Sequence, residues 1–102
     1  MSVNGLIVPL LTPMNEDASL DKIGLKSLTA RLMNKGVRNF VVLSPYGENS
    51  SLSVEQEKEA IRIVSSTIGA RGNLLVGCFS DATDAIIEKV KFAEKFTSNC
   101  LV

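Results

Sequence analysis

Short apolar runs alternate along the chain with longer stretches that mix apolar and charged residues. Four of these runs, at residues 6–11, 39–44, 74–79 and 100–102, are nearly continuous in aliphatic or β-branched side chains. Strands that are covered on both faces, as in parallel sheets, have this pattern. We therefore expect four buried strands, the last of which has only just begun at residue 102.

The three intervening stretches have the period of amphipathic helices. The first helix is predicted over residues 21–35, with Ser19 or Asp21 as its N-cap and Gly36 at its end. The residues on its apolar face are Leu25, Leu28 and Leu32. The second helix is predicted over residues 54–68. Its apolar residues are Ala60, Ile61, Val64 and Ile68.

Both later helices have candidate caps at their starts. Ser53 stands three residues before Gln56, which is the spacing of a capping box. Ser80 or Asp81 can cap the third helix, predicted over residues 82–96. The residues on its apolar face are Ile86, Val90 and Ala93, and those on its polar face are Glu88, Lys91 and Lys95.

The alternation of strand and helix predicts an α/β fold with a parallel sheet and right-handed crossovers. No linker divides residues 1–102, so we predict a single domain. A parallel sheet needs neighbours and covering layers, so a sheet that stops within the apolar run 100–102 is expected to be incomplete. A (β/α)8 barrel needs ~250 residues. The three and a half βα units expected here would form a little under half of such a barrel.

Composition excludes several classes of function. Eleven basic and eleven acidic residues give no net charge, which argues against nucleic acid and anionic membranes as partners. No apolar run reaches the ~18 residues of a membrane span, and the start lacks the charges of a signal peptide. We therefore predict a cytoplasmic protein that contacts neither nucleic acid nor membrane.

The chain contains no histidine, which removes every catalytic or metal site that depends on imidazole. Cys78 and Cys100 have no CxxC spacing and no third ligand, so we predict no metal site and interpret both as small buried apolar side chains.

Ligands of parallel α/β folds gather at the carboxyl ends of the strands. The residues there are Thr12 and Pro13, the segment 44–49, and Ser80 with Asp81. Tyr46 is equally compatible with proton transfer and with a simple sheet-capping role. Thr12 either ends its strand or lines a pocket. All the lysines lie in predicted helices or at their ends, facing solvent, so none is a credible Schiff-base nucleophile.

Two segments and one short motif resemble the dihydrodipicolinate synthase and N-acetylneuraminate lyase family, which includes archaeal 2-keto-3-deoxygluconate aldolases. The segments are GLIVPLLTPMNEDASLD at 5–21 and NKGVRNFVVLSPYGENSSLSVEQE at 34–57. Gly-Cys-Phe at 77–79 sits where the third strand of the family reaches its glycine. These landmarks occur in the family's order along the whole chain.

The resemblance implies a TIM barrel, a parallel (β/α)8 fold of which residues 1–102 form the N-terminal part, and a homotetramer when the protein is complete. It also implies a lyase of class I aldolase type without a cofactor. A lysine on the sixth strand forms a Schiff base with pyruvate or another 2-oxo acid, which then reacts with an aldehyde. That lysine and the proton-shuttling tyrosine of the family would lie beyond Val102. We therefore expect the 102-residue chain alone to be inactive.

The second loop departs from the Gly-Thr-Thr-Gly-Glu pattern of the family. Pro45 occupies the place of the threonine that relays protons, and it has neither a hydroxyl nor an N–H group. Tyr46 stands where the second threonine holds the substrate carboxylate, and its hydroxyl can still bind that group. The residues predicted to bind substrate are Tyr46, Gly47, Ser44 and Thr12. This departure favours a sugar-acid aldolase, or a lyase of altered substrate, over a synthase.

Two alternatives remain open. In the first, the chain is a noncatalytic half-barrel that self-associates or pairs with a partner half. In the second, the chain is a small open-sheet α/β domain that binds an anion through residues 44–49. The sequence lacks the GxGxxG and P-loop spacings of nucleotide sites, which argues against a nucleotide as that anion.

Overall fold

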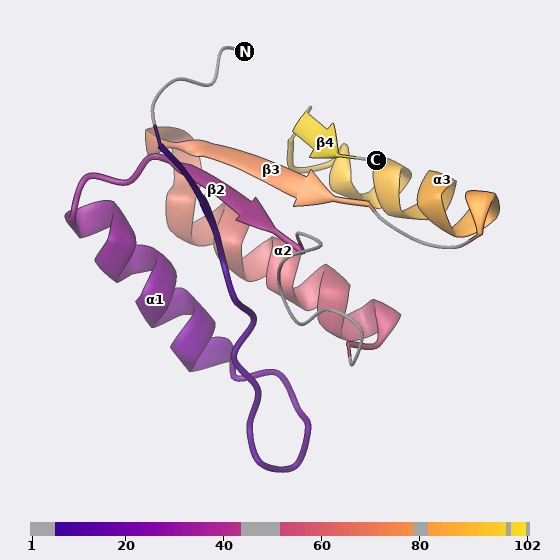
Figure 1. The fold of residues 1–102 in the computed structure, drawn as a ribbon, viewed down its shortest axis with the longest axis horizontal. Helices are drawn as coiled ribbons and strands as arrows, with labels where there is room; N and C mark the ends of the chain where they lie inside the picture. The colour runs from indigo at the N-terminus through magenta and orange to yellow at the C-terminus, as the bar shows by residue number, and fades with distance from the viewer. Residues whose placement is uncertain (1–5, 44–51, 79–81, 98, 102) are drawn as a thin grey trace.

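The computed structural model describes residues 6–43, 52–78, 82–97 and 99–101 (Figure 1). Its strands are parallel neighbours in the order β1-β2-β3-β4, and they span Ile7–Pro9, Asn39–Val42, Asn73–Gly77 and Asn99–Leu101. The helices α1, α2 and α3 span Lys22–Asn34, Val54–Ile68 and Thr83–Ala93. A 3-10 turn, Gly69–Arg71, leads from α2 into β3. The predicted α/β class, with its parallel sheet, is confirmed.

All three helices pack against one face of the sheet. A single apolar core joins Phe40 and Val76 of the strands to Leu25, Val64 and Ala93 of the helices. Because the order of the strands follows the sequence, each crossover places its helix on that same face. Doubly wound sheets reverse their strand order and carry helices on both faces, whereas barrels do neither. The arrangement is therefore an arc of a barrel.

A pair of asparagines fixes the register of the first three strands. Asn39 pairs with Ile7 on one side and Asn73 on the other. The Asn73 side-chain amide donates to Asn39 Oδ1 at 2.7 Å, and Asn39 Nδ2 donates to the Leu6 carbonyl oxygen at 3.2 Å. Asn39 is only 2% exposed, so a slip of one residue would leave its amide buried without these partners.

Helix α1 begins as predicted but buries a different stripe. Asp21 caps it by accepting a hydrogen bond from the Gly24 N–H at 2.8 Å. The buried residues are Leu25, Thr29 and Met33, whereas Leu28 and Leu32 are only partly buried. The predicted face is therefore wrong by part of a turn. A polar residue fits this stripe because the Thr29 hydroxyl donates to the Leu25 carbonyl oxygen at 2.8 Å.

Helix α2 has the predicted bounds, and all four of its predicted apolar residues are buried. Both hydrogen bonds of the Ser53–Gln56 capping box are present. Helix α3 ends three residues earlier than predicted, at Ala93, and turns so that the Phe92 and Phe96 rings meet at 5.3 Å. The residue at its N-cap position is Ala82, so the predicted caps are wrong in position; Ser80 and Asp81 lie outside the described residues.

The first strand presents apolar side chains to solvent. Leu6, Ile7 and Leu11 are 72%, 42% and 60% exposed, although Leu10 between them is buried. Strand β1 pairs only with β2 within the described sheet. None of the helices in the described ranges is long and apolar enough to cross a membrane.

Candidate functional site

The carboxyl ends of β1, β2 and β3 lie at one edge of the sheet, where the sequence places its candidate chemistry. Thr12 follows β1, whose pairing extends to a hydrogen bond from the Leu10 N–H to the Val41 carbonyl oxygen at 2.8 Å. Leu43 follows β2, and Cys78 follows β3. The other predicted residues, which are Ser44, Pro45, Tyr46, Gly47, Ser80 and Asp81, lie outside the described ranges.

Thr12 is the predicted site residue whose surroundings are described. Its side chain is buried, with 8% exposure. Its hydroxyl oxygen is buried and has no hydrogen-bond partner among the residues that the structure describes. Because an unpaired buried hydroxyl lowers stability by roughly 1–3 kcal/mol, such a group calls for an explanation. A donor or acceptor left free at the ligand-binding edge of a sheet is suited to binding a polar ligand.

Leu43 turns the chain sharply where β2 ends. It has a φ of 62°, in the left-handed region that large aliphatic side chains rarely adopt. Its side chain is nonetheless buried in the apolar core, with 4% exposure. Core packing therefore holds a strained backbone directly before the predicted substrate loop. Sequence reasoning missed this feature, since a leucine after a strand carries no signal of a left-handed conformation.

The thiol of Cys78 is suited to packing and not to nucleophilic attack. Cys78 is fully buried, as predicted, whereas Cys100 is only partly buried. Burial, and then the neighbouring Cys100, raise the pKa of the Cys78 thiol to about 11. The thiolate is the reactive form of cysteine, so this group is inert near neutral pH.

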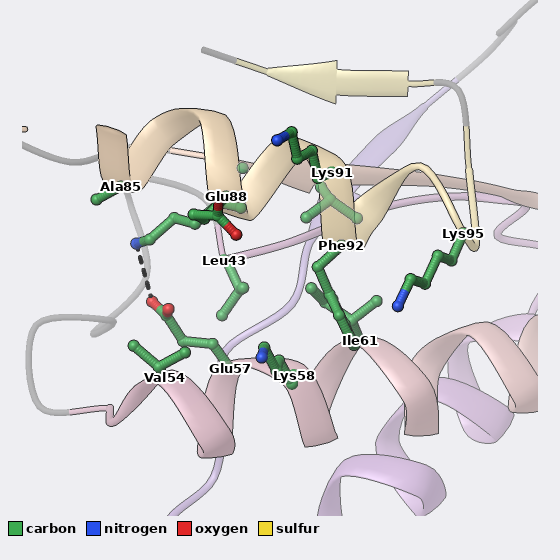
Figure 2. A pocket seen from close by; sticks show the side chains of 13 residues that line it. Leu43, Val54, Glu57, Lys58, Ile61, Ala85, Glu88, Lys91, Phe92 and Lys95 are labelled. Atoms are coloured by element: carbon green, nitrogen blue, oxygen red, sulfur yellow. Dashed lines mark hydrogen bonds and ion pairs between the residues drawn. The ribbon is translucent and has the colours of Figure 1, made fainter. Parts of the chain in front are cut away.

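The lysines lie on the helices or at their ends, as predicted, but one of them does not face solvent. The Lys89 ammonium of α3 lies 3.3 Å from a carboxylate oxygen of Glu57 on α2, and the two side chains are only 26% and 13% exposed (Figure 2). The prediction that every lysine is solvated is therefore wrong for Lys89. An ammonium held in an ion pair on the helical face is not a free amine directed at the edge of the sheet.

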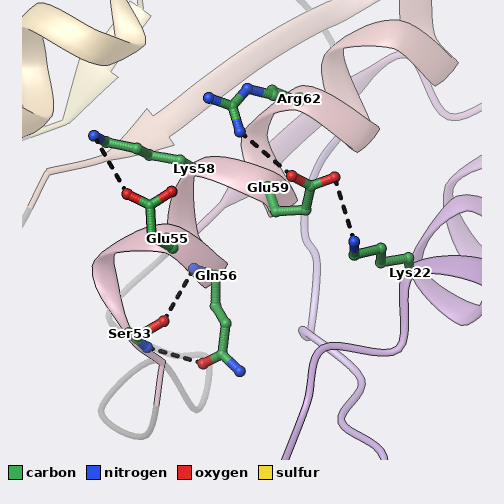
Figure 3. A network of polar contacts seen from close by, with 7 residues as sticks. All are labelled: Lys22, Ser53, Glu55, Gln56, Lys58, Glu59 and Arg62. Atoms are coloured by element: carbon green, nitrogen blue, oxygen red, sulfur yellow. Dashed lines mark hydrogen bonds and ion pairs between the residues drawn. The ribbon is translucent and has the colours of Figure 1, made fainter.

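Gln56 connects the start of α2 to the connection between β1 and α1. Its side-chain oxygen accepts a hydrogen bond from the Ser53 N–H at 2.9 Å, and the Gln56 N–H bonds to Ser53 Oγ at 3.1 Å (Figure 3). Its side-chain nitrogen donates to the Ala18 carbonyl oxygen at 3.0 Å. Lys22 of α1 also lies 3.9 Å from Glu59 of α2. These contacts hold the segment that follows Thr12 against the helix that follows the predicted substrate loop.

Comparison with known proteins identifies the family to which this chain belongs. The model of the dihydrodipicolinate synthetase family matches residues 2–102. The chain belongs to the dihydrodipicolinate synthetase family. The family resemblance seen in the sequence is therefore confirmed.

Two members of the dihydrodipicolinate synthetase family among the curated relatives are named 4-hydroxy-tetrahydrodipicolinate synthase. The protein of Polynucleobacter asymbioticus is 33% identical over 94 residues, covering 92% of this chain and 31% of the relative. The protein of Dechloromonas aromatica is 32% identical over 97 residues, covering 95% and 33%. The chain thus spans about a third of the length of these relatives.

Solved structures agree with the family. The N-acetylneuraminate lyase from Fusobacterium nucleatum superposes with a TM-score of 0.88 at 28% identity, covering 95% of this chain and 34% of that one. The dihydrodipicolinate synthase from Agrobacterium tumefaciens superposes with a TM-score of 0.85 at 27% identity, covering 95% and 33%. The described elements correspond to the first part of a (β/α)8 barrel.

Proposed function

We propose that residues 1–102 form the opening part of a pyruvate-dependent lyase or aldolase that works through a Schiff base. The family match over residues 2–102 is the observation that carries this proposal. In this account the chain supplies groups that bind the 2-oxo acid, and the nucleophilic lysine and the proton-shuttling tyrosine come from strands beyond Val102. The complete protein would be a cytoplasmic homotetramer whose second substrate is an aldehyde.

The free hydroxyl of Thr12 supports a binding role at the carboxyl edge of the sheet. It is buried just after β1 and has no partner among the described residues, and a hydroxyl group can donate a hydrogen bond to a substrate oxygen. Tyr46, Gly47 and Ser44 complete the proposed carboxylate site. Pro45 cannot relay a proton, which favours a sugar-acid or otherwise altered substrate over the synthase reaction.

The uncovered surface of β1 supports the barrel as the working form. Leu6, Ile7 and Leu11 would all leave solvent if another strand and helix of a closed barrel covered β1. Burial of apolar area at this edge stabilises the ring by roughly 25 cal/mol for each Å² removed from water.

The reading frame downstream of the Val102 codon tests the proposal. We expect it to encode further βα units, with a lysine directly after the sixth strand and a tyrosine at the carboxyl end of a later strand. A frame that encodes these units without that lysine would overturn the Schiff-base mechanism, because the lysines of residues 1–102 lie on helices or at their ends and the Lys89 ammonium is held in an ion pair with Glu57.

The second candidate is a noncatalytic half-barrel, and the same exposed apolar residues of β1 favour it. A second copy, or a partner half, could cover this strand in place of later strands of the same chain. Sedimentation of the purified 102-residue chain separates the two candidates. A folded dimer with β1 protected from hydrogen exchange favours the half-barrel, whereas a chain that stays monomeric or aggregates, with β1 unprotected, favours the truncated enzyme.

A further inference from the structure

A groove of about 480 Å³ lies between α2 and α3 on the helical face of the sheet (Figure 2). Its floor is apolar and is formed by Leu43, Ile61 and Val76, with Phe92 projecting from α3 beside Ile61. The first two helices make many close contacts, but α2 and α3 diverge enough to leave this space between them. Its volume is that of a small-molecule site.

Three cationic groups gather around the ring of Phe92 at one end of this groove. Lys58 Nζ and Arg62 Cζ, both from α2, lie 5.3 Å from the centre of the ring, and Lys95 Nζ lies 5.4 Å from it. One aromatic ring attracts a cation by about 0.5–1 kcal/mol at an exposed site, and three cations around it repel one another. The ring alone therefore does not account for the cluster.

The acidic groups nearby balance this cluster only in part. Lys58 lies 3.9 Å from Glu55, and Arg62 lies 3.3 Å from Glu59, both along the exposed side of α2. Lys95 has no ion-pair partner among the described residues. The remaining carboxylates of the groove, Glu57 and Glu88, lie toward its other end, where Glu57 pairs with Lys89 (Figure 2).

We propose that this groove binds a small organic anion whose carboxylate or phosphate group is carried on an apolar or aromatic body. The anionic group would lie among Lys58, Arg62 and Lys95, and the apolar body would cover Leu43, Ile61 and Val76. Pyruvate has no such body, and its proposed site lies at the carboxyl edge of the strands. The groove borders that edge at Leu43 and Gly77, but its cationic end lies on α2 and just after α3, so the proposed anion site is separate from the proposed catalytic site.

Calorimetric titration of the complete protein, residues 1–102 together with the units encoded downstream, with phenyl phosphate, inorganic phosphate, benzoate and phenol tests the proposal. Phenyl phosphate should bind saturably and at least about tenfold more tightly than inorganic phosphate or phenol, because it carries both the charge and the body. Comparison with benzoate shows which anionic group the cluster prefers. The affinity should fall as salt is added, since the cations are partly exposed.

Variants of single lysines show whether the anion lies where proposed. Lys95→Gln and Lys58→Gln should each weaken phenyl phosphate binding by about three- to fivefold, the effect of one partly exposed ion pair. Lys26→Gln is the matched control, because Lys26 lies on α1, is exposed and does not line the groove. Lys26 and Lys58 lie on helices and Lys95 lies in the turn after α3, and circular dichroism checks that the variants remain folded.

Three results would overturn the proposal. The first is phenyl phosphate binding no more tightly than phosphate and phenol. The second is an equal loss of affinity in Lys26→Gln and Lys95→Gln. The third is self-association of the protein that depends on its concentration and is abolished by Lys95→Gln, together with no saturable ligand binding. That result would show that another copy of the chain occupies the groove.

Discussion

The side-chain amide of Gln56 joins the start of α2 to the carbonyl oxygen of Ala18, 38 positions earlier in the chain. The same side chain closes the capping box with Ser53. One residue therefore sets both the first turn of α2 and the position of the connection that follows Thr12. This relationship links the start of α2 to the connection between β1 and α1.

Replacement of Gln56 by glutamate should separate its two roles. Glutamate keeps the oxygen that accepts from the Ser53 N–H but cannot donate to the Ala18 carbonyl oxygen. We expect faster hydrogen exchange of the Asn15 and Ala18 amides, with the first turn of α2 still protected. Ser53→Ala is the matched control, because it removes the cap and leaves the bond to Ala18. Equal exchange patterns in the two variants would contradict the tether.

Ala18→Gly should stabilise the chain. Ala18 is exposed and has a φ of 68°, a left-handed conformation that costs an alanine about 1 kcal/mol. Glycine relieves that strain, but it also makes the unfolded chain more flexible, which increases the entropy lost on folding. We therefore expect a net rise of about 0.5 kcal/mol in the free energy of unfolding in urea. Ala30→Gly, inside α1, should lower it by about 1 kcal/mol. A loss of similar size in both variants would refute the assigned backbone strain.

Thr12→Val tests whether the hydroxyl of Thr12 is free. Valine keeps the shape of threonine and removes an oxygen that has no partner among the described residues, so the free energy of unfolding should stay unchanged or rise by up to about 1 kcal/mol. Thr97→Val should lower it by about 1–2 kcal/mol, because Thr97 Oγ1 donates to the Leu74 carbonyl oxygen at 2.6 Å and accepts from the Asn99 N–H at 3.1 Å. If both variants lose the same stability, Thr12 has a partner and is not available to substrate.

The stability of the chain should fall at alkaline pH because of Cys78. Burial raises the pKa of this thiol from 9.0 to about 11, so the folded state holds the proton more tightly than the unfolded state. Its contribution is fully present below pH 9 and is lost as the pH rises through 11, at roughly 1.4 kcal/mol for each unit between these values. Urea unfolding across this range measures the effect.

Cys78→Ala is the control for this dependence, since every other titratable group is present in both proteins. The difference in unfolding free energy between the two proteins should be constant below pH 9 and should shrink above it. A difference that stays constant to pH 11 would show that the thiol ionises equally well in the folded chain.

Local patterns predicted the elements, because helix periodicity and caps are written in consecutive residues. The capping box of Ser53 and Gln56 is one example, and the end of α1 just before Gly36, which has a φ of 97°, is another. Features that depend on neighbours in space could not be predicted this way. The contact of Gln56 with Ala18 and the pairing of Lys89 with Glu57 join residues more than 30 positions apart.

The errors at α1 and α3 have the same origin. Leucine periodicity favoured Leu28 and Leu32, but packing against α2 and the sheet selects the stripe that contains Thr29, whose hydroxyl is satisfied within its own helix. The contact between the Phe92 and Phe96 rings accompanies the early end of α3. The candidate site was predicted mainly from the family resemblance. Of the residues predicted to bind substrate, Thr12 is the one that lies within the described ranges.

Borohydride reduction in the presence of pyruvate, followed by mass spectrometry of the intact protein and its peptides, tests the central claim most directly. The 102-residue chain should gain no covalent adduct, whereas the polypeptide extended by the downstream reading frame should carry one reduced pyruvyl group on the lysine that follows the sixth strand. An adduct on a lysine of α2 or α3, or an extended barrel that contains this lysine and remains unmodified, would contradict the account.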